Sequence, residues 1–259
     1  MSQIGIGNLL REWRRRRHLS QLELALEAGV SARHVSFVET GRSRPSAEMV
    51  LHLAEQLEVP LRDRNQLLLA AGYAPRFGER SLDEPEMEPV REAIDLVLKA
   101  HDPYPAAVVD RAWNLVAAND GIGLLTKGAA PELLEPPANA LRIALHPDGM
   151  APRILNLGEW RAHLLARLAR QAAVTGDEDL TALYEELSAY PGPPADDSAA
   201  ADLGIFVPLR LRAGNGELAF LSTVTTFGTA VDITVAELSI EAFLPADGHT
   251  AEAVRRVQS

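Results

Sequence analysis

The N-terminal part of the chain alternates helix-start and helix-stop signals, and this pattern restricts the fold more than any other feature. Ser20 precedes an apolar-periodic segment and Glu23 follows it by three residues, which is the capping-box arrangement. Gly29 marks the end of that helix, Ser31 begins the next, and Gly41 ends it. Two short helices joined by a tight glycine-containing turn form a helix-turn-helix unit.

Three further helices are predicted around this unit. In the second helix of the series we expect Leu22, Ala25 and Leu26 to form the buried stripe, and in the third we expect Val35 and Val38 to face it. In the first helix we expect Leu9, Leu10 and Trp13 to form the apolar face. Apolar spacing and caps predict five helices, over residues 7–17, 21–28, 32–40, 46–57 and 61–71.

The chain changes character after this all-α five-helix domain, which we assign to residues 1–72. Residues 73–89 are rich in Pro, Gly and charge, which is typical of a linker. Residues 90–250 mix helices with short β-type runs and predict an α/β (α+β) domain, whose mainly antiparallel five-stranded sheet is covered on one face by helices. Residues 251–259 are expected to be a tail. The predicted helices are 90–100, 159–174 and 177–190, and the predicted strands are 105–110, 113–119, 205–212, 216–227 and 235–245, with a hairpin at 106–117 and a tight turn at 213–216.

Charge divides the chain in the same way. Of its 259 residues, residues 1–80 hold 12 of the 25 Lys+Arg and 9 of the 36 Asp+Glu, so they carry +3 while the remainder carries −14. A basic module joined to an acidic one is suited to bind DNA through one face only. The sequence shows neither a membrane span nor a signal peptide, so we expect a cytoplasmic protein, and the absence of Cys excludes disulfides and thiolate metal sites.

The third helix is the expected DNA-recognition element, because the second helix of such a unit inserts its N-terminal residues into the major groove. Arg33 has the two donors that match guanine O6 and N7, and His34 has a donor for a base or a phosphate. For Phe37, packing in the core is favoured over contact with a thymine methyl. The predicted groove-facing residues are Ser31, Ala32, Arg33, His34, Ser36 and Phe37.

Phosphate contacts are expected from residues around this helix. Gln21 stands in the first turn of the second helix, where its amide and the helix N-terminus can both bond a phosphate. Arg14, Arg42 and Arg44 carry guanidinium groups that match phosphate geometry. They are predicted to contribute affinity and salt dependence but no sequence preference.

The stretch "LSQLELALEAGVSARHVSFVETGRSRPSAEMVLHLAEQLEVP" resembles the helix-turn-helix of the XRE family, the group of Cro and the lambdoid phage repressors. Gln21, Glu39 to Gly41 and Pro45 to Ser46 carry the resemblance. The remainder, through "HDPYPAAVVDRAWNLVAAN" and "FGTAVDITVAELSIEAFLPAD", resembles the MmyB-like ligand-binding domain of bacterial regulators, a PAS-like fold. The resemblance implies a homodimeric regulator, some members of which accommodate a fatty-acid-like molecule.

An enzyme requires a constellation of catalytic residues that is not evident in this sequence. His101, His146 and His163 are isolated, and neither a zinc-protease motif nor a nucleophile elbow is present. The carboxylates of Glu237 and Glu241 are four residues apart and are interpreted as a solvated face. We therefore expect no catalytic activity, no metal and no cofactor other than a bound fatty acid or similar effector.

A PAS-like sheet binds its ligand between the sheet and the covering helices, in a pocket that is mostly apolar with a few polar anchors. Asn119, Arg153 and Asn156 are the candidate anchors for a polar head, although ordinary structural roles are equally compatible with these residues. The candidate walls, for which plain core packing is an equal alternative, are Val108, Trp113, Leu115, Phe206, Leu209, Phe220 and Phe227.

These observations together predict a dimeric transcriptional regulator, most simply a repressor, that binds a pseudo-palindromic DNA operator and senses a small apolar ligand. Two-fold symmetry is expected because one small module makes few contacts, whereas a dimer places two recognition helices one DNA turn apart. A regulator without a ligand, or an antitoxin-like module that binds DNA or protein, is the alternative.

Overall fold

The computed structural model describes residues 5–193, 206–214 and 216–257, which form two compact units. The N-terminal unit consists of the chain up to Arg80 with Ala173–Thr175 and Thr229–Ala236. The C-terminal unit consists of Ser81–Ala172, Gly176–Gly228 and the chain from Glu237 onward. None of the described helices combines the length and the apolar character that a bilayer crossing needs.

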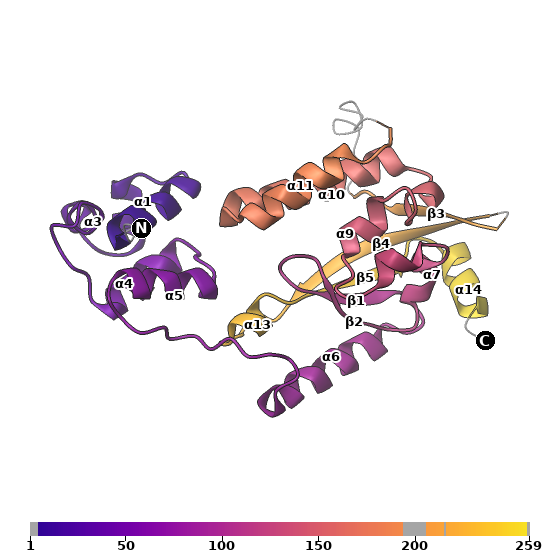
Figure 1. Cartoon of the computed structure of the whole chain (residues 1–259), viewed down its shortest axis with the longest axis horizontal. Coiled ribbons are helices and arrows are strands. Elements are labelled where there is room, and N and C mark those ends of the chain that lie inside the picture. Colours follow the sequence, from indigo (N-terminus) through magenta and orange to yellow (C-terminus); the bar gives the residue numbers. More distant parts are fainter. Residues whose placement is uncertain (1–4, 194–205, 215, 258–259) are drawn as a thin grey trace. The chain divides into compact units, whose positions relative to one another are not determined.

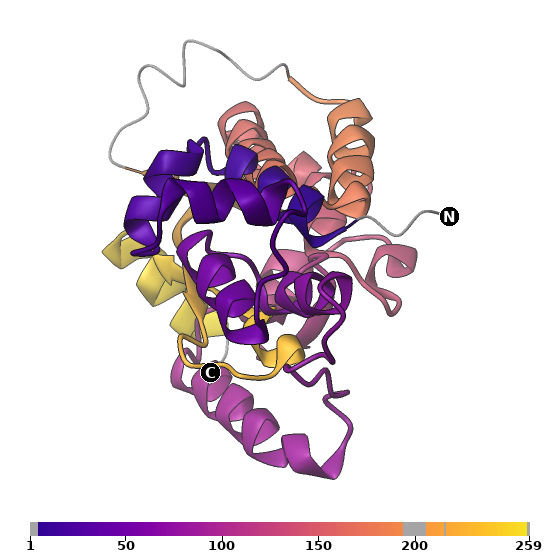
Figure 2. The ribbon, with the colours of Figure 1, turned by 90° about the vertical axis from the view of Figure 1, so that its left-hand side faces the viewer.

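The N-terminal unit contains the five helices that the capping signals predict (Figure 1 and Figure 2). Ser20 and Glu23 form a complete capping box, with the Ser20 side chain accepting from the Glu23 N–H. Ser31 and Ser46 cap the next two helices by accepting from the N–H three residues ahead. The helices are α1 Ile6–Arg16, α2 Gln21–Glu27, α3 Ala32–Glu39, α4 Ala47–Gln56 and α5 Leu61–Ala70.

The buried face of α2 differs from the predicted one. Leu24 and Ala25 are buried, whereas Leu22 is 60% exposed and Leu26 is 72% exposed. The helix is only seven residues long, and the side that packs against α3 and α4 carries Leu24 and Ala25, so its buried face is rotated from the predicted one. Val35 and Val38 of α3 are buried as expected.

The segment predicted as a linker is partly built into the N-terminal unit. The side chain of Asn65 on α5 accepts hydrogen bonds from the N–H groups of Arg76 and Phe77 and donates one to the Phe77 carbonyl. The chain then pairs with the segment Thr229–Ala236, which contains the short helix α13 Ile233–Ala236. The Ile233 N–H donates to the Gly78 carbonyl at 2.8 Å.

The C-terminal unit is built on the predicted five-stranded antiparallel sheet, in the order β2-β1-β5-β4-β3. The strand predicted from Val235 begins later, because Val235 lies in α13. The strand predicted from Ile205 begins at Leu209; Ile205, and Asn215 in the predicted tight turn, lie outside the described residues. The strands are β1 Ala106–Val109, β2 Leu115–Ala118, β3 Leu209–Ala213, β4 Gly216–Thr226 and β5 Ser239–Pro245.

Helices cover both faces of this sheet, whereas the sequence pattern predicted one covered face. Ile94 and Leu98 of α6 pack on Val108 and Ile240, while Trp160 of α10 belongs to a second core on the opposite face. All four residues of β1 are buried, as expected for a strand covered on both sides. The helices of this unit are α6 Glu88–Ala100, α7 Ile122–Thr126, α8 Pro131–Leu134, α9 Ala140–Leu145, α10 Leu157–Thr175, α11 Glu178–Ala189 and α14 Gly248–Val257, with 3-10 turns at η1 Pro85–Met87 and η2 Ala151–Arg153.

Residues 251–257 of the segment predicted as a tail belong to helix α14 Gly248–Val257, which contributes to the core. Val254 is 2% exposed and packs in the larger core, and the Thr250 hydroxyl accepts a hydrogen bond from the Ala219 N–H of β4 at 3.0 Å. The prediction failed because a short helix with few apolar residues lacks a strong periodic signal, although it buries the residues that face the sheet.

Candidate DNA-binding surface and ligand cavity

Helices α2 and α3 are joined by a tight turn of the kind that a helix-turn-helix unit requires. Ala28 ends α2, Gly29 adopts a φ of 61°, and Ser31 caps α3. A positive φ is readily adopted by glycine, so the predicted stop signal has the expected physical basis. Because Val35 and Val38 anchor α3 to the core, its opposite face is available to solvent.

The solvent-facing side of α3 holds the predicted groove-facing residues together. Arg33 and Ser31 are exposed, and Ala32, His34 and Ser36 are half-buried. Within the described residues, Nε2 of His34 is the one buried side-chain nitrogen or oxygen atom without a hydrogen-bond partner. The arrangement therefore presents one strong cation and several small polar side chains along the first turns of α3.

Phe37 lies on this surface and not in the core, contrary to the favoured expectation. It is half-buried and lies outside the core cluster of the N-terminal unit. The guanidinium of Arg33 lies 5.0 Å from its ring centroid, and that of Arg42 lies 5.8 Å from it. Cations within about 6 Å of an aromatic face are attracted to it, so Phe37 holds two arginines beside α3.

Arg14 has a different environment from the predicted phosphate-contacting one. It is 9% exposed, and its Nε and Nη2 donate to the two carboxylate oxygens of Glu39 at 2.6 and 3.0 Å. Its Nη1 donates to the Leu19 carbonyl. These contacts connect α1 to the end of α3, so Arg14 organises the fold and is not included in the interface below.

Glu39 also positions Gln21. The Gln21 amide donates to Oε2 of Glu39 at 2.7 Å, which leaves its second N–H available. Burial raises the pKa of Glu39, but the hydrogen bonds from Arg14 and Gln21 outweigh burial, and the net pKa is lowered. Glu39 was overlooked as an organising residue, because the sequence shows only an acid before a glycine stop.

The two arginines after α3 also differ from each other. Arg42 is exposed beside Phe37. Arg44 donates through Nε and Nη2 to the Ala71 carbonyl, at 3.2 and 2.9 Å, and stacks on Tyr73. Arg44 therefore holds the end of α5, whereas Arg42 keeps the environment expected of a phosphate contact.

The C-terminal unit contains a small cavity between the sheet and its covering helices. Its volume is about 60 Å³, well below the roughly 300 Å³ at which pockets for drug-sized ligands begin. Two of the predicted wall residues, Leu115 and Leu209, line it. The lining residues are Ala107, Val109, Leu115, Ile122, Leu125, Thr126, Ala140, Leu141, Ile143, Ala144, Met150, Trp160, Leu164, Leu209, Glu241 and Phe243.

The other predicted wall residues lie elsewhere. Val108 faces the α6 side of the sheet, and Phe227 packs against that same core. Phe206 is 58% exposed. Trp113 and Phe220 are buried in the larger core without lining the cavity. The prediction chose large apolar residues, whereas the strand register decides which neighbour faces inward: Val109, and not Val108, reaches the cavity.

The three predicted polar anchors make structural hydrogen bonds. Asn119 accepts from the Ala106 N–H and donates to the Tyr104 carbonyl, which fixes the ends of β1 and β2. Asn156 accepts from the Arg210 N–H and donates to the Pro208 carbonyl. None of the three lines the small cavity.

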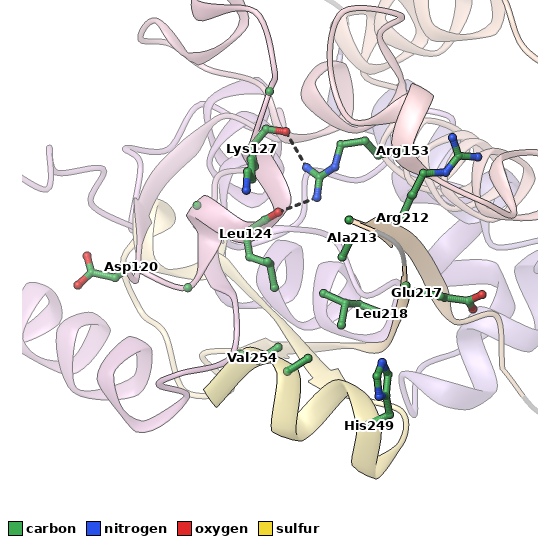
Figure 3. Close-up of a pocket in the computed structure, with 16 residues that line it drawn as sticks. Asp120, Leu124, Lys127, Arg153, Arg212, Ala213, Glu217, Leu218, His249 and Val254 are labelled. Atoms are coloured by element: carbon green, nitrogen blue, oxygen red, sulfur yellow. Dashed lines mark hydrogen bonds between the residues drawn. The ribbon is translucent and has the colours of Figure 1, made fainter. Parts of the chain in front are cut away.

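Arg153 lines a separate, open basin instead, shown in Figure 3. Its guanidinium donates to the carbonyls of Leu124, Leu125 and Lys127, and burial lowers its pKa. These carbonyls belong to the last turn of α7 and to Lys127 directly after it, so Arg153 supports the C-terminal end of α7.

The charged residue that does line the cavity is Glu241, which the sequence placed on a solvated face. It is 8% exposed and pairs with Arg167 of α10, whose guanidinium lies 4.4 Å from the ring centroid of Trp113. A residue between Ile240 and Ala242, which face the α6 core, must point to the opposite core. Strand alternation was the signal that could have identified it.

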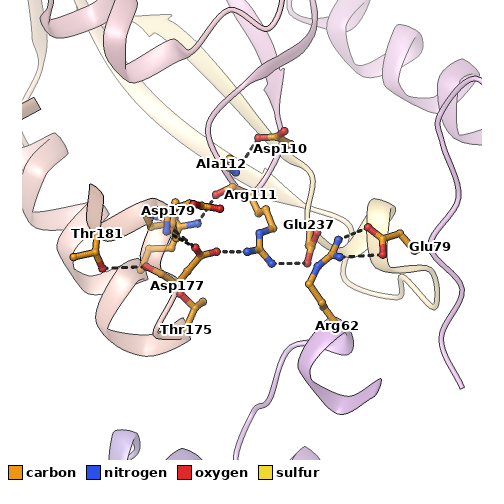
Figure 4. A network of polar contacts seen from close by, with 12 residues as sticks. Arg62, Glu79, Asp110, Arg111, Ala112, Thr175, Asp177, Asp179, Thr181 and Glu237 are labelled. Atoms are coloured by element: carbon orange, nitrogen blue, oxygen red, sulfur yellow. Dashed lines mark hydrogen bonds and ion pairs between the residues drawn. The ribbon is translucent and has the colours of Figure 1, made fainter. Parts of the chain in front are cut away.

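A polar network continues from Trp113 along the turn between β1 and β2, and Figure 4 shows its Arg111, Asp177 and Glu237 side chains. The Trp113 indole N–H donates to Gln171, and Gln171 donates to the Arg111 carbonyl, both at 2.9 Å. The Arg111 side chain pairs with Asp177 and with Glu237. The turn that carries Trp113 is thus tied to α10, to α11 and to the start of β5.

Comparisons with known proteins agree with both halves of this description. Residues 10–63 match a helix-turn-helix family model, and residues 90–257 match the model of the MmyB-like transcription regulator ligand binding domain. A Bacillus subtilis (strain 168) protein named as an uncharacterized HTH-type transcriptional regulator, RghRB, is 32% identical over 114 residues, which cover 44% of this chain and 73% of that protein. The chain belongs to the family of DNA-binding transcriptional regulators that join an XRE-type helix-turn-helix to an MmyB-like ligand-binding domain.

Proposed function

We propose that this regulator binds a specific DNA operator through α3, with Arg33 as the main base-contacting residue. The observation that carries the proposal is the position of Phe37 between Arg33 and Arg42 on the exposed side of a capped helix. Stacking on the ring restricts both guanidinium groups before DNA arrives, so less conformational entropy is lost on binding. Arg33 contacts a guanine edge in the major groove, and Arg42 contacts a backbone phosphate.

The remaining groups at this surface have supporting roles in the proposal. Gln21, held by Glu39, donates its second N–H to a phosphate. Ser31, Ala32, His34 and Ser36 lie close to base edges. Arg14 stabilises the module from its interior, and the exposed Arg44 stabilises it through the Ala71 carbonyl.

We further propose that the protein is a homodimer that represses transcription. It acts in the bacterial cytoplasm, which contains the operator DNA. A single helix-turn-helix module makes few contacts, whereas two modules related by two-fold symmetry bind successive half-sites about 34 Å apart. The effector in this proposal is a small molecule with an apolar chain like that of a fatty acid, bound in the cavity beside Trp160. The dimer has one conformation with high and one with low affinity for DNA. The ligand shifts the equilibrium between them only by the difference between its own affinities for the two conformations.

The experiment uses the full-length protein and the DNA upstream of its own gene. Arg33→Ala and Gln21→Ala are expected to weaken binding by at least about tenfold. Arg170→Ala, at an exposed arginine of α10, is the matched control and should bind as the wild type does. Unchanged affinity in Arg33→Ala contradicts the assignment of α3, and sedimentation of the free protein as a monomer contradicts the dimer.

A further inference from the structure

The cavity of the C-terminal unit has an unusual polar composition. Among the described residues that line it, Glu241 is the one with a charged side chain, and it projects from an inward-facing position of the central strand β5. A carboxylate can accept hydrogen bonds and cannot donate them. Thr126, which also lines the cavity, donates its hydroxyl proton to the Ile122 carbonyl, so it too presents lone pairs to the cavity.

The carboxylate retains acceptor capacity after its structural contact is made. Arg167 bonds Oε1 of Glu241, and the structure gives no partner for Oε2 among the described residues. A carboxylate has about four lone-pair sites, so at least one oxygen is free to accept from a molecule in the cavity. Hydrogen bonds to an ionised acceptor are stronger than those between neutral groups.

Charge decides which kind of donor fits. The Glu241–Arg167 pair is neutral as a whole, and adding another ion to this apolar site leaves a buried charge without a partner. A carboxylate on the ligand is repelled by the carboxylate of Glu241. An ammonium on the ligand bonds the same carboxylate as Arg167 and is repelled by its guanidinium. The indole N–H of Trp160, which also lines the cavity, is a neutral donor, so it cannot compensate the negative charge of an anionic ligand.

We propose that the ligand of this cavity is a small apolar molecule with a neutral hydroxyl or N–H donor that bonds Oε2 of Glu241, and that an anionic head group is selected against. This inference rests on the proposed function, because it names the head group of the proposed apolar effector. Met150 in the wall has an unbranched side chain that can rearrange, so a molecule larger than the present 60 Å³ is accommodated by movement of the wall.

The test compares three probes with the same carbon chain: 1-hexanol, hexanoate and hexylammonium at pH 7. Binding to the full-length protein, with its three Trp residues intact, is measured by isothermal titration calorimetry. We expect 1-hexanol to bind at least about tenfold more tightly than either ion. In Glu241→Gln the preference for 1-hexanol over hexanoate should fall below about threefold, because the charge is gone and an amide remains.

Two further variants make the result specific. Glu217→Gln, on β4 outside this cavity, is the matched control and should keep the wild-type preference. Ala144→Leu adds bulk to the cavity wall and should weaken 1-hexanol binding by about tenfold or more, and Ala140→Val makes a smaller addition to the same wall if the first variant is unstable.

The outcomes separate this inference from the proposed function. Equal binding of 1-hexanol and hexanoate, or tighter binding of hexanoate, overturns the head-group inference and leaves an apolar effector in place. Failure of the wild type to bind any of the three probes overturns the apolar effector, and the head-group inference with it.

Discussion

The carboxylate of Glu39 lies 2.6 Å from Nε and 3.0 Å from Nη2 of Arg14, in a bidentate pair that is almost fully buried. Gln21 donates to the same carboxylate, and Arg11 approaches it within 3.5 Å. One acidic residue at the end of α3 therefore fixes α1, the start of α2 and α3 relative to one another. The position of the recognition helix depends on this contact.

Arg14→Ala should destabilise the N-terminal unit strongly. Removing one partner of a buried ion pair leaves the other charge uncompensated, which costs about 3 kcal/mol or more. The measurement is urea denaturation of the full-length protein followed by far-UV circular dichroism. Arg15→Ala, at an exposed arginine of the same helix, is the control and should stay within about 0.5 kcal/mol of wild type. A loss of DNA binding in Arg14→Ala with unchanged stability would instead indicate a direct phosphate contact.

The same pair predicts a pH dependence. The pKa of Glu39 is lower in the folded protein than its unfolded value of about 4.3, so the unfolded state takes up the proton more readily. The stabilisation is therefore present above that value and is lost as pH falls through the folded pKa. Denaturation at pH values between about 5 and 3 should show a smaller acid-induced loss of stability in Glu39→Gln than in wild type. Equal losses in the two proteins would exclude Glu39 as a contributor, and Glu132→Gln, at an exposed position of α8, is the control.

Phe37→Ala should weaken operator binding without a large effect on folding. The ring restricts Arg33 and Arg42 and lies outside the core, so its loss removes preorganisation and little packing. We expect a loss of affinity of about fivefold to thirtyfold, in line with a cation–π contribution of about 0.5–1 kcal/mol for each of the two exposed arginines. Fluorescence anisotropy on labelled operator measures it. Phe206→Ala removes a 58% exposed ring from the other unit and should leave affinity unchanged. A Phe37→Ala protein that unfolds would instead place the ring in the core.

Asp232→Asn should weaken the contacts of the segment 229–236 with Gly78 and Arg80 of the N-terminal unit. Asp232 bonds Arg80 at 3.0 Å and accepts from the Thr234 N–H, and the adjacent Ile233 N–H donates to Gly78. Hydrogen exchange at the Ile233 amide should accelerate by about tenfold, because the amide now opens more often. Asp148→Asn, at an exposed aspartate of the other unit, should not change that rate. Unchanged exchange in Asp232→Asn would show that the carboxylate does not hold this segment.

The helix boundaries of the N-terminal unit were predictable because each depends on local chemistry. Ser20, Ser31 and Ser46 cap helices by bonding N–H groups three residues away, and Gly29 ends one by adopting a positive φ. The strands were also predictable, apart from their ends. These features need no knowledge of what lies across the fold.

The roles of single side chains were less predictable, because they depend on long-range contacts. Arg14 and Arg44 have the composition of phosphate contacts, but Glu39 and the Ala71 carbonyl lie 25 and 27 residues away from them. Glu241 was interpreted with helical spacing, although strand alternation places it inside. The second covering layer of the sheet is α6, which packs on β1 and β5. The alternation of residues within the strands does not show that a helix covers this face.

The assignment of Arg33 to base contact and of Arg42 to phosphate contact is tested most directly by affinities for a selected operator and its single-base variants, measured over a range of salt concentrations. Arg33→Ala should lose discrimination at one guanine position, by about tenfold, and bind the other variants in their wild-type order. Arg42→Ala should weaken all sites alike and reduce the salt slope by about one. An Arg33→Ala protein that keeps full discrimination at every base pair would contradict the account.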